Sequence, residues 1–195
     1  MMIPLRTQVK FFLENPEGVD LATFSPVFQR WIQQKALKGQ LIDVADYRHV
    51  FEGPGMVLIG YDSDYFIENR DGRLGLLYTR KRQVDADVQA QLRASLQLAL
   101  DACQLLEADD AFNPRLKFRA DEIELRFPDR LRLPNKPETF DLIKDDVGTV
   151  LAELYGSDSV NFAPVSNDPR YLFTIAVQHP GVTSINELFQ AAREV

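Results

Sequence analysis

The chain has 195 residues, of which 45% are hydrophobic and 26% charged, a balance typical of a globular protein with a real core and not of a disordered one. Its net charge of -7 argues against a nucleic-acid-binding surface, because neutralising phosphates requires an excess of Lys and Arg. The single cysteine, Cys103, excludes an intramolecular disulfide. No stretch approaches the ~20 apolar residues of a membrane span and no signal-peptide pattern is seen, so we expect a cytoplasmic protein with no membrane partner.

The N-terminal part of the chain predicts a strand, a helix and a second strand. Apolar residues alternate with others over residues 6–13, as in a strand. Ser25 suits the N-cap of a helix whose first residue is Pro26, because a proline loses no helical hydrogen bond there. We expect Gly39 to end this helix and residues 41–45 to form the next strand.

The strongest β signal lies in the second quarter of the chain. The apolar run 56–61 is typical of a covered central strand, and residues 62–64 are a tight turn that leads to a strand at 65–69. Residues 70–73 carry a hairpin signal, and residues 74–79 return. We predict three antiparallel strands in a meander.

A long helix is predicted next. Apolar residues recur every three or four positions from Val84 to Leu106, and Cys103 falls on this stripe as a small core residue. Between residues 116 and 127 two alternating patterns meet with a phase slip at Asp121 and Glu122. The slip indicates either a hairpin turn or a bulge.

The C-terminal part predicts two more helices and two strands. Pro137 begins a helix that Gly156 ends, and strands follow at 160–165 and 171–178. A capping box of Ser184 with Glu187 begins the last helix.

These elements predict an α+β fold, an antiparallel or mixed sheet with helices packed on it. We expect one domain over residues 1–195, with two internal halves, 1–110 and 111–195, as an alternative division. Residues 42–45 parallel residues 160–163, each after a helix, which suggests a β-α-β-β pseudo-duplication. Chance similarity within an α+β chain is the other explanation.

One candidate site lies before and within the Gly53-Pro54-Gly55 bend. Asp46 lies three residues before His49, and a carboxylate beside an imidazole suits acid–base chemistry or a metal. The alternative is that both are ordinary polar groups of a strand end and a loop. The bend itself lacks the phosphate-loop pattern and is expected to be a β-turn.

The basic run Arg80-Lys81-Arg82 is a second candidate site. In an acidic protein it suits a small anionic ligand, with Tyr78 beside it, although such a run is more often a solvated strand end whose charge opposes edge pairing. The full set of candidate binding residues is Asp46, Tyr47, His49, Gly53, Gly55, Tyr78, Arg80 and Arg82.

The segment 126–136 mixes arginines with apolar residues. Arg126, Arg130 and Arg132 suit a loop that contacts another protein, because arginines and exposed aliphatics are common at interfaces. A connector whose arginines lie along apolar surface is the alternative.

The segments 42–55 and 75–82, with Gly53-Pro54-Gly55 and Gly75-Leu76-Leu77-Tyr78-Thr79, resemble an uncharacterised bacterial protein family with no assigned activity. The likeness covers mainly residues 20–82. It implies a bacterial cytosolic origin and carries no functional residue over.

No catalytic motif is present, so we expect no catalytic residue, cofactor or metal, and we lean against an enzyme. The first functional hypothesis is a non-catalytic module that binds a protein partner or self-associates as a homo-oligomer. The alternative is a protein, or an enzyme, that binds a small anionic ligand in a pocket near Asp46, His49 and the Gly53–Gly55 bend.

Overall fold

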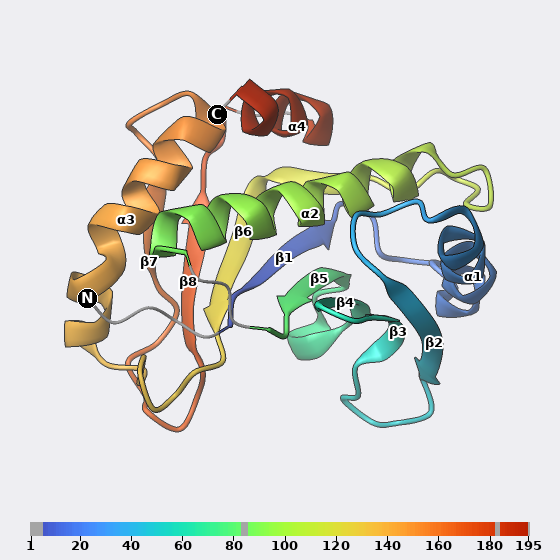
Figure 1. Cartoon of the computed structure of the whole chain (residues 1–195), viewed down its shortest axis with the longest axis horizontal. Coiled ribbons are helices and arrows are strands. Elements are labelled where there is room, and N and C mark those ends of the chain that lie inside the picture. Colours follow the sequence, from blue (N-terminus) through green and yellow to red (C-terminus); the bar gives the residue numbers. More distant parts are fainter. Residues whose placement is uncertain (1–5, 83–85, 182–183, 195) are drawn as a thin grey trace.

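The computed structural model describes residues 6–82, 86–181 and 184–194. In this part of the chain eight strands and four α-helices follow one another (Figure 1). The strands are β1 (Gln8–Leu13), β2 (Leu41–Tyr47), β3 (Gly55–Gly60), β4 (Ser63–Glu68), β5 (Gly75–Arg80), β6 (Phe118–Phe127), β7 (Asn161–Pro164) and β8 (Phe173–Gln178). The helices are α1 (Phe24–Gln34), α2 (Val88–Ala108), α3 (Pro137–Tyr155) and α4 (Ile185–Glu194).

All eight strands form one antiparallel sheet in the order β2-β3-β4-β5-β1-β6-β8-β7. The predicted α+β fold is confirmed, and so is the meander of β3, β4 and β5. β1 and β6 are neighbours in the middle of the sheet, although more than 100 residues separate them in the chain. The pseudo-duplication stays a prediction.

The helices pack on one face of this sheet. Figure 1 shows α2 crossing the strands, with α3 and α4 near it and α1 at the β2 end. α2 contacts β1, β5, α3 and α4, while α1 contacts β2 and β3. All four helices contribute to a single cluster of buried apolar side chains.

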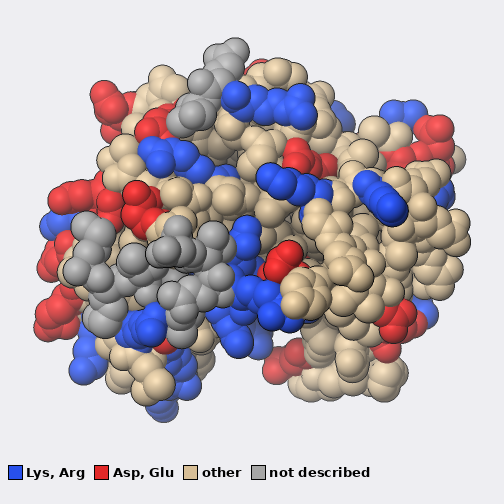
Figure 2. Space-filling model, in the orientation of Figure 1, with Lys and Arg blue, Asp and Glu red and all other residues tan. Residues whose placement is uncertain are grey.

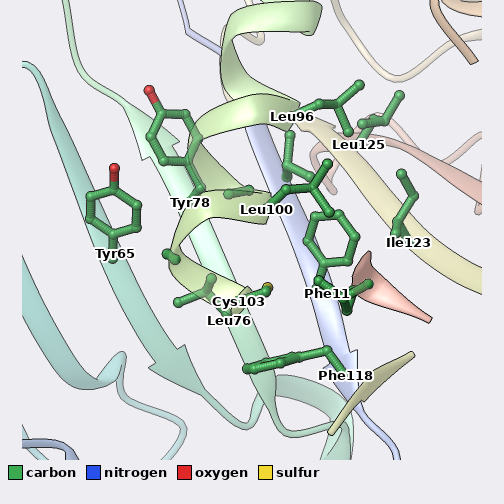
Figure 3. Packing of buried hydrophobic residues seen from close by; sticks show 14 of the residues in the cluster. Phe11, Tyr65, Leu76, Tyr78, Leu96, Leu100, Cys103, Phe118, Ile123 and Leu125 are labelled. Carbon is green, nitrogen blue, oxygen red and sulfur yellow. The ribbon is translucent and has the colours of Figure 1, made fainter. Parts of the chain in front are cut away.

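Side-chain alternation explains why the core lies on that face. In β1, Val9, Phe11 and Leu13 point towards α2, because successive residues of a strand point to opposite sides. Figure 3 shows Phe11 below Leu100 of α2, with Cys103 in the same layer. Cys103 is fully buried, as predicted, and burial raises the pKa of its thiol well above the ordinary value, which keeps it unreactive.

The first helix differs from its prediction at both ends. It begins at Phe24, so Pro26 lies inside the first turn, where a backbone N–H has no helical partner to lose. It ends before Gly39, because Lys35 adopts a left-handed conformation with φ 52° and caps the helix. Short 3-10 turns at Leu21–Thr23 and Arg70–Gly72 complete the connections.

The phase slip at Asp121 and Glu122 is a bulge within one long strand and not a hairpin turn. Phe11 pairs with Ile123, whereas Leu13 pairs with Phe118, so β6 has extra residues between two pairs with β1. Val84, predicted in the stripe of α2, lies outside the described residues, and α2 begins at Val88.

The face that carries the helices mixes charges of both signs. Figure 2 shows acidic side chains gathered over α3 and basic side chains near the middle of the same face. On the opposite face of the sheet the strands carry no α-helix of the described part.

Candidate functional site

The residues predicted to bind a ligand do not meet in one place. Gly55 approaches the backbone of Ile67, close to the last residue of β4. Arg80 pairs with Ser63, the first residue of β4. β4 has six residues, and at ~3.3 Å per residue its two ends lie about 16 Å apart. The glycine bend and the basic run are thus at opposite ends of the meander.

Asp46, Tyr47 and His49 lie at the β2 edge of the sheet. Arg48 binds the Asp46 carboxylate with its Nε at 2.9 Å from Oδ1 and its Nη2 at 2.7 Å from Oδ2. These side-chain bonds lower the pKa of Asp46 to about 2. The carboxylate is committed to Arg48, and no hydrogen bond between Asp46 and His49 is found in the described part of the chain.

The basic run points in alternating directions. Lys81 pairs with Asp64 at 2.8 Å. The Arg82 guanidinium lies over the Tyr61 ring, 3.8 Å from its centroid, and its Nε donates to the Tyr61 carbonyl at 3.2 Å. Tyr78 is fully buried beneath the helices. These side chains therefore do not form one exposed anion site.

Arg126 lies in β6 and not in the predicted contact loop. Its side chain binds the Glu68 and Glu124 carboxylates and is 7% exposed, so it is not available for contact with another protein. Arg130 Nη2 donates to the Pro169 carbonyl at 2.7 Å, and the Arg132 backbone N–H donates to the Asp129 carbonyl at 3.1 Å. The arginine-bearing segment is thus braced against the loop between β7 and β8.

The face opposite the helices contains a buried cluster of charges. Lys10 of β1 is 0% exposed, and its Nζ lies 2.7 Å from Glu68 Oε1 of β4. Arg126 Nη1 reaches the same oxygen at 3.2 Å, and its Nε and Nη2 bind Glu124 Oε2 at 2.9 and 2.7 Å. We call Lys10, Glu68, Glu124 and Arg126 the charge cluster.

Strand register explains how the charge cluster assembles. Lys10 pairs with Glu124 on one side and with Leu77 of β5 on the other. Gly75 lies between Phe12 of β1 and Glu68. A Cβ on Gly75 would lie 2.1 Å from the Phe11 carbonyl oxygen, so only glycine allows this close approach of β5 to β1.

Burial and ion pairing shift the pKa values of Lys10 and Glu68 in the charge cluster. Burial lowers the pKa of Lys10, and attraction to Glu68 offsets only part of this effect. Burial raises the pKa of Glu68, but Lys10, the Arg70 backbone N–H and Arg126 together outweigh it, so the pKa of Glu68 is lowered overall. Glu68 is therefore a carboxylate at neutral pH.

Two adjoining hollows lie over this cluster. The larger has a volume of about 530 Å³ and the smaller about 300 Å³. Both are bordered by Glu52, Arg70, Arg126 and Leu172. We call the pair the arginine cleft. The larger hollow is also lined by Glu124, Val165, Ser166, Arg170, Tyr171 and Thr174, and the smaller by Gln8, Gly53, Pro54, Phe66, Glu68 and Leu77.

The three guanidinium groups of the arginine cleft differ in their partners. Arg126 is bound by the charge cluster, and Arg170 binds Asp168 with Nη2 2.6 Å from Oδ2. Arg70 donates its backbone N–H to Glu68 Oε2 at 2.6 Å, but its side chain has no partner among the described residues. Arg70 is thus an uncommitted cation at the junction of the two hollows.

Glu52 borders the same junction in an unusual backbone conformation. Its φ is 52°, in the left-handed region that non-glycine residues seldom occupy. Such backbone strain persists only where the surrounding structure fixes it, and it is frequent at ligand sites. Glu52 and Arg70 both border the two hollows, so a ligand here meets both signs of charge.

Sequence reasoning located part of this site and missed the rest. Of the predicted residues, Gly53 and Arg126 line the cleft. Lys10, Glu68 and Arg70 were missed. The available signal was Lys10 itself, a charge within the apolar strand that runs from Val9 to Leu13.

Within residues 6–82, 86–181 and 184–194 no group of three His, Cys, Asp or Glu side chains has the arrangement of a metal site. No helix of the same residues combines the length and the apolar character that crossing a membrane requires.

A comparison of the chain with protein-family models, with curated proteins and with solved structures finds no match to any of them.

Proposed function

We propose that this protein binds a small molecule carrying a carboxylate or phosphate group in the arginine cleft. The observation that carries the proposal is the Arg70 side chain, which borders both hollows and has no partner among the described residues. A guanidinium is always charged, and its parallel N–H donors match a carboxylate or phosphate. An anion that enters the cleft therefore meets a cation without having to displace an existing ion pair.

The charge cluster supports this role by fixing the floor of the cleft. Lys10 and Arg126 balance Glu68 and Glu124, so the cluster adds little net charge. Its contribution is a guanidinium held in one orientation, which reduces the entropy lost when a ligand binds.

The dimensions and lining of the cleft suit a small molecule with an apolar part. Hollows of about 530 and 300 Å³ fall in the usual range for such sites. Leu172 and Tyr171 offer apolar surface, while Ser166 and Thr174 offer hydroxyl groups. This proposal agrees with the sequence-based alternative that the ligand is a small anion. It differs in the residue that binds the anion in the cleft, which is Arg70 and not Arg80 or Arg82.

Isothermal titration calorimetry with citrate and inorganic phosphate as probes tests the proposal. Charge-assisted hydrogen bonds contribute about 1.5–3 kcal/mol, so Arg70→Gln should weaken binding of a probe by about tenfold or more. Arg115→Gln is the matched control, because Arg115 is exposed and pairs with Asp110 outside the cleft. Failure of both probes to bind, or equal binding by the two variants, would contradict the proposal.

The first sequence-based hypothesis, a module that binds a protein partner or itself, stays a prediction without a structural observation that favours it. Both sheet edges carry groups that oppose strand addition: the Val44 N–H of β2 is taken by Asp43 Oδ1 at 2.8 Å, and β7 ends at Pro164. Phe51 and Leu131 are 92% and 97% exposed, but single exposed apolar residues need no partner. Sedimentation velocity measures the oligomeric state directly.

A further inference from the structure

A second group of polar side chains lies at the far end of the meander, beneath the helices. Tyr65 pairs with Tyr78, and Ser63 pairs with Arg80. Because residues two apart in a strand share a face, all four lie on the helix-covered side. The two rings meet edge to face with centroids 5.3 Å apart, and Figure 3 shows both hydroxyl groups pointing the same way, away from Leu76 and Phe118.

This group has hydrogen-bond donors without acceptors. The hydroxyl groups of Tyr65 and Tyr78 and the Nε of Arg80 are buried, and none has a partner at full hydrogen-bond geometry in the described part of the chain. Ser63 lies near both hydroxyl groups and Arg80 near that of Tyr78, each close enough to oppose the rise in pKa. Both tyrosines are 0% exposed. Burial raises the pKa of Tyr78, with Arg80 and Ser63 acting in the opposite direction, so the phenol keeps its proton at neutral pH and remains a donor. Buried donors in native proteins are nearly always paired, so three together require an explanation.

The charged side chains around the group leave one positive charge, that of Arg80, without an acidic partner in the part of the chain that the structure describes. Lys81 and Arg82 have acidic partners, Asp64 at 2.8 Å and Asp62 at 3.8 Å. Asp101 of α2, whose charge acts on Tyr65, accepts a bond from Gln97 Nε2 at 2.9 Å. Arg80, by contrast, has no ion-pair partner among the described residues. The neighbouring carboxylates are thus engaged, and the cation beside the two phenols is not.

We propose that Tyr65, Tyr78 and Arg80 form a binding site for a small oxyanion of the phosphate class, with Ser63 as a further hydroxyl donor. An oxyanion supplies several acceptors at once, and a tetrahedral one matches donors that arrive from two tyrosines and a guanidinium. The site is distinct from the arginine cleft, because it lies on the other face of the sheet and at the other end of β4.

Thermal unfolding in inorganic phosphate, compared with chloride at the same ionic strength, tests this site. Phosphate should raise the melting temperature of the wild-type protein, because a ligand that binds only the folded state stabilises it. Arg80→Gln should raise the phosphate dissociation constant by about tenfold or more. Arg82→Gln, which removes a cation that already has partners, should leave the constant unchanged. The proposal is wrong if phosphate has no effect on the wild type, or if the two variants lose the effect equally.

Two further variants separate this site from its alternatives. Tyr78→Phe removes an unpaired buried donor, so it should raise the melting temperature in chloride and yet diminish the gain from phosphate. A lower melting temperature in chloride would mean that the hydroxyl is already hydrogen-bonded in the free protein, and would overturn the proposal. Because phosphate also probes the arginine cleft, Arg70→Gln should keep the part of the phosphate effect that Arg80→Gln removes. If Arg70→Gln loses the whole effect while Arg80→Gln keeps it, the anion binds only in the arginine cleft, and the proposal is wrong.

Discussion

At the scale of single residues, Lys10 shows what a local sequence pattern reveals and what it hides. A lysine within an apolar strand indicates a buried charge, and a buried charge needs a partner. The pattern does not name the partner, because Glu68 lies 58 residues away along the chain. The basic surroundings of Arg126 predict a loop, although its alternation with Glu124 continues the strand.

Removing either Lys10 or Glu68 alone should lower the free energy of unfolding more than removing both. Lys10→Met leaves Glu68 buried with a weaker set of partners, and breaking such a pair typically costs 3–5 kcal/mol, so we expect a loss of roughly that size. The double variant Lys10→Met with Glu68→Leu should recover most of it. Urea unfolding of the two single variants and the double variant measures the coupling, and additive losses would contradict a direct interaction.

The lowered pKa of Glu68 predicts a pH dependence of stability. The unfolded carboxyl has its ordinary value of 4.5, so the stabilisation is fully present above that pH and is lost as pH falls through the lower folded value. The wild type should therefore lose more unfolding free energy on acidification than Glu68→Gln does. Parallel pH profiles of the two proteins would show that Glu68 is not stabilised as a carboxylate.

At the scale of elements, the sequence predicts best where the signal is local. The meander of β3–β5, α2 and the helix that Pro137 begins and Gly156 ends follow from periodicity, turn residues and caps. The end of α1 was missed, because the cap is a left-handed Lys35 and not a glycine. The β6 slip had two local explanations, and only pairing with β1 decided between them.

Two glycines with similar backbone angles should respond differently to substitution. Gly55 has φ +66° and Gly72 has φ +69°, but a Cβ would lie 2.0 Å from the Ile67 carbonyl oxygen at Gly55 and would meet nothing within 4 Å at Gly72. Gly72→Ala should cost about 1–2 kcal/mol from the left-handed backbone alone. Gly55→Ala should cost clearly more in urea unfolding. Equal losses would contradict the close contact between β3 and β4.

At the scale of the whole molecule, the candidate site depends on strand order, which local sequence does not encode. The charge cluster draws on β1, β4 and β6, and the arginine cleft adds the loops before β3 and β8. The predicted set joined the glycine bend to the basic run because they are near in sequence. The meander holds them at opposite ends, because an odd number of antiparallel strands, β3, β4 and β5, lies between the bend and the basic run.

An NMR titration of the isotope-labelled protein with citrate tests the central claim most directly. If the arginine cleft binds the anion, the backbone amide signals that move are those of Arg70, Ser166 and Thr174, and Arg70→Gln moves the titration to about tenfold higher citrate or beyond. If no signal moves, or if the signals that move belong to Asp46, Tyr47 and His49 at the β2 edge, the cleft is not the binding site.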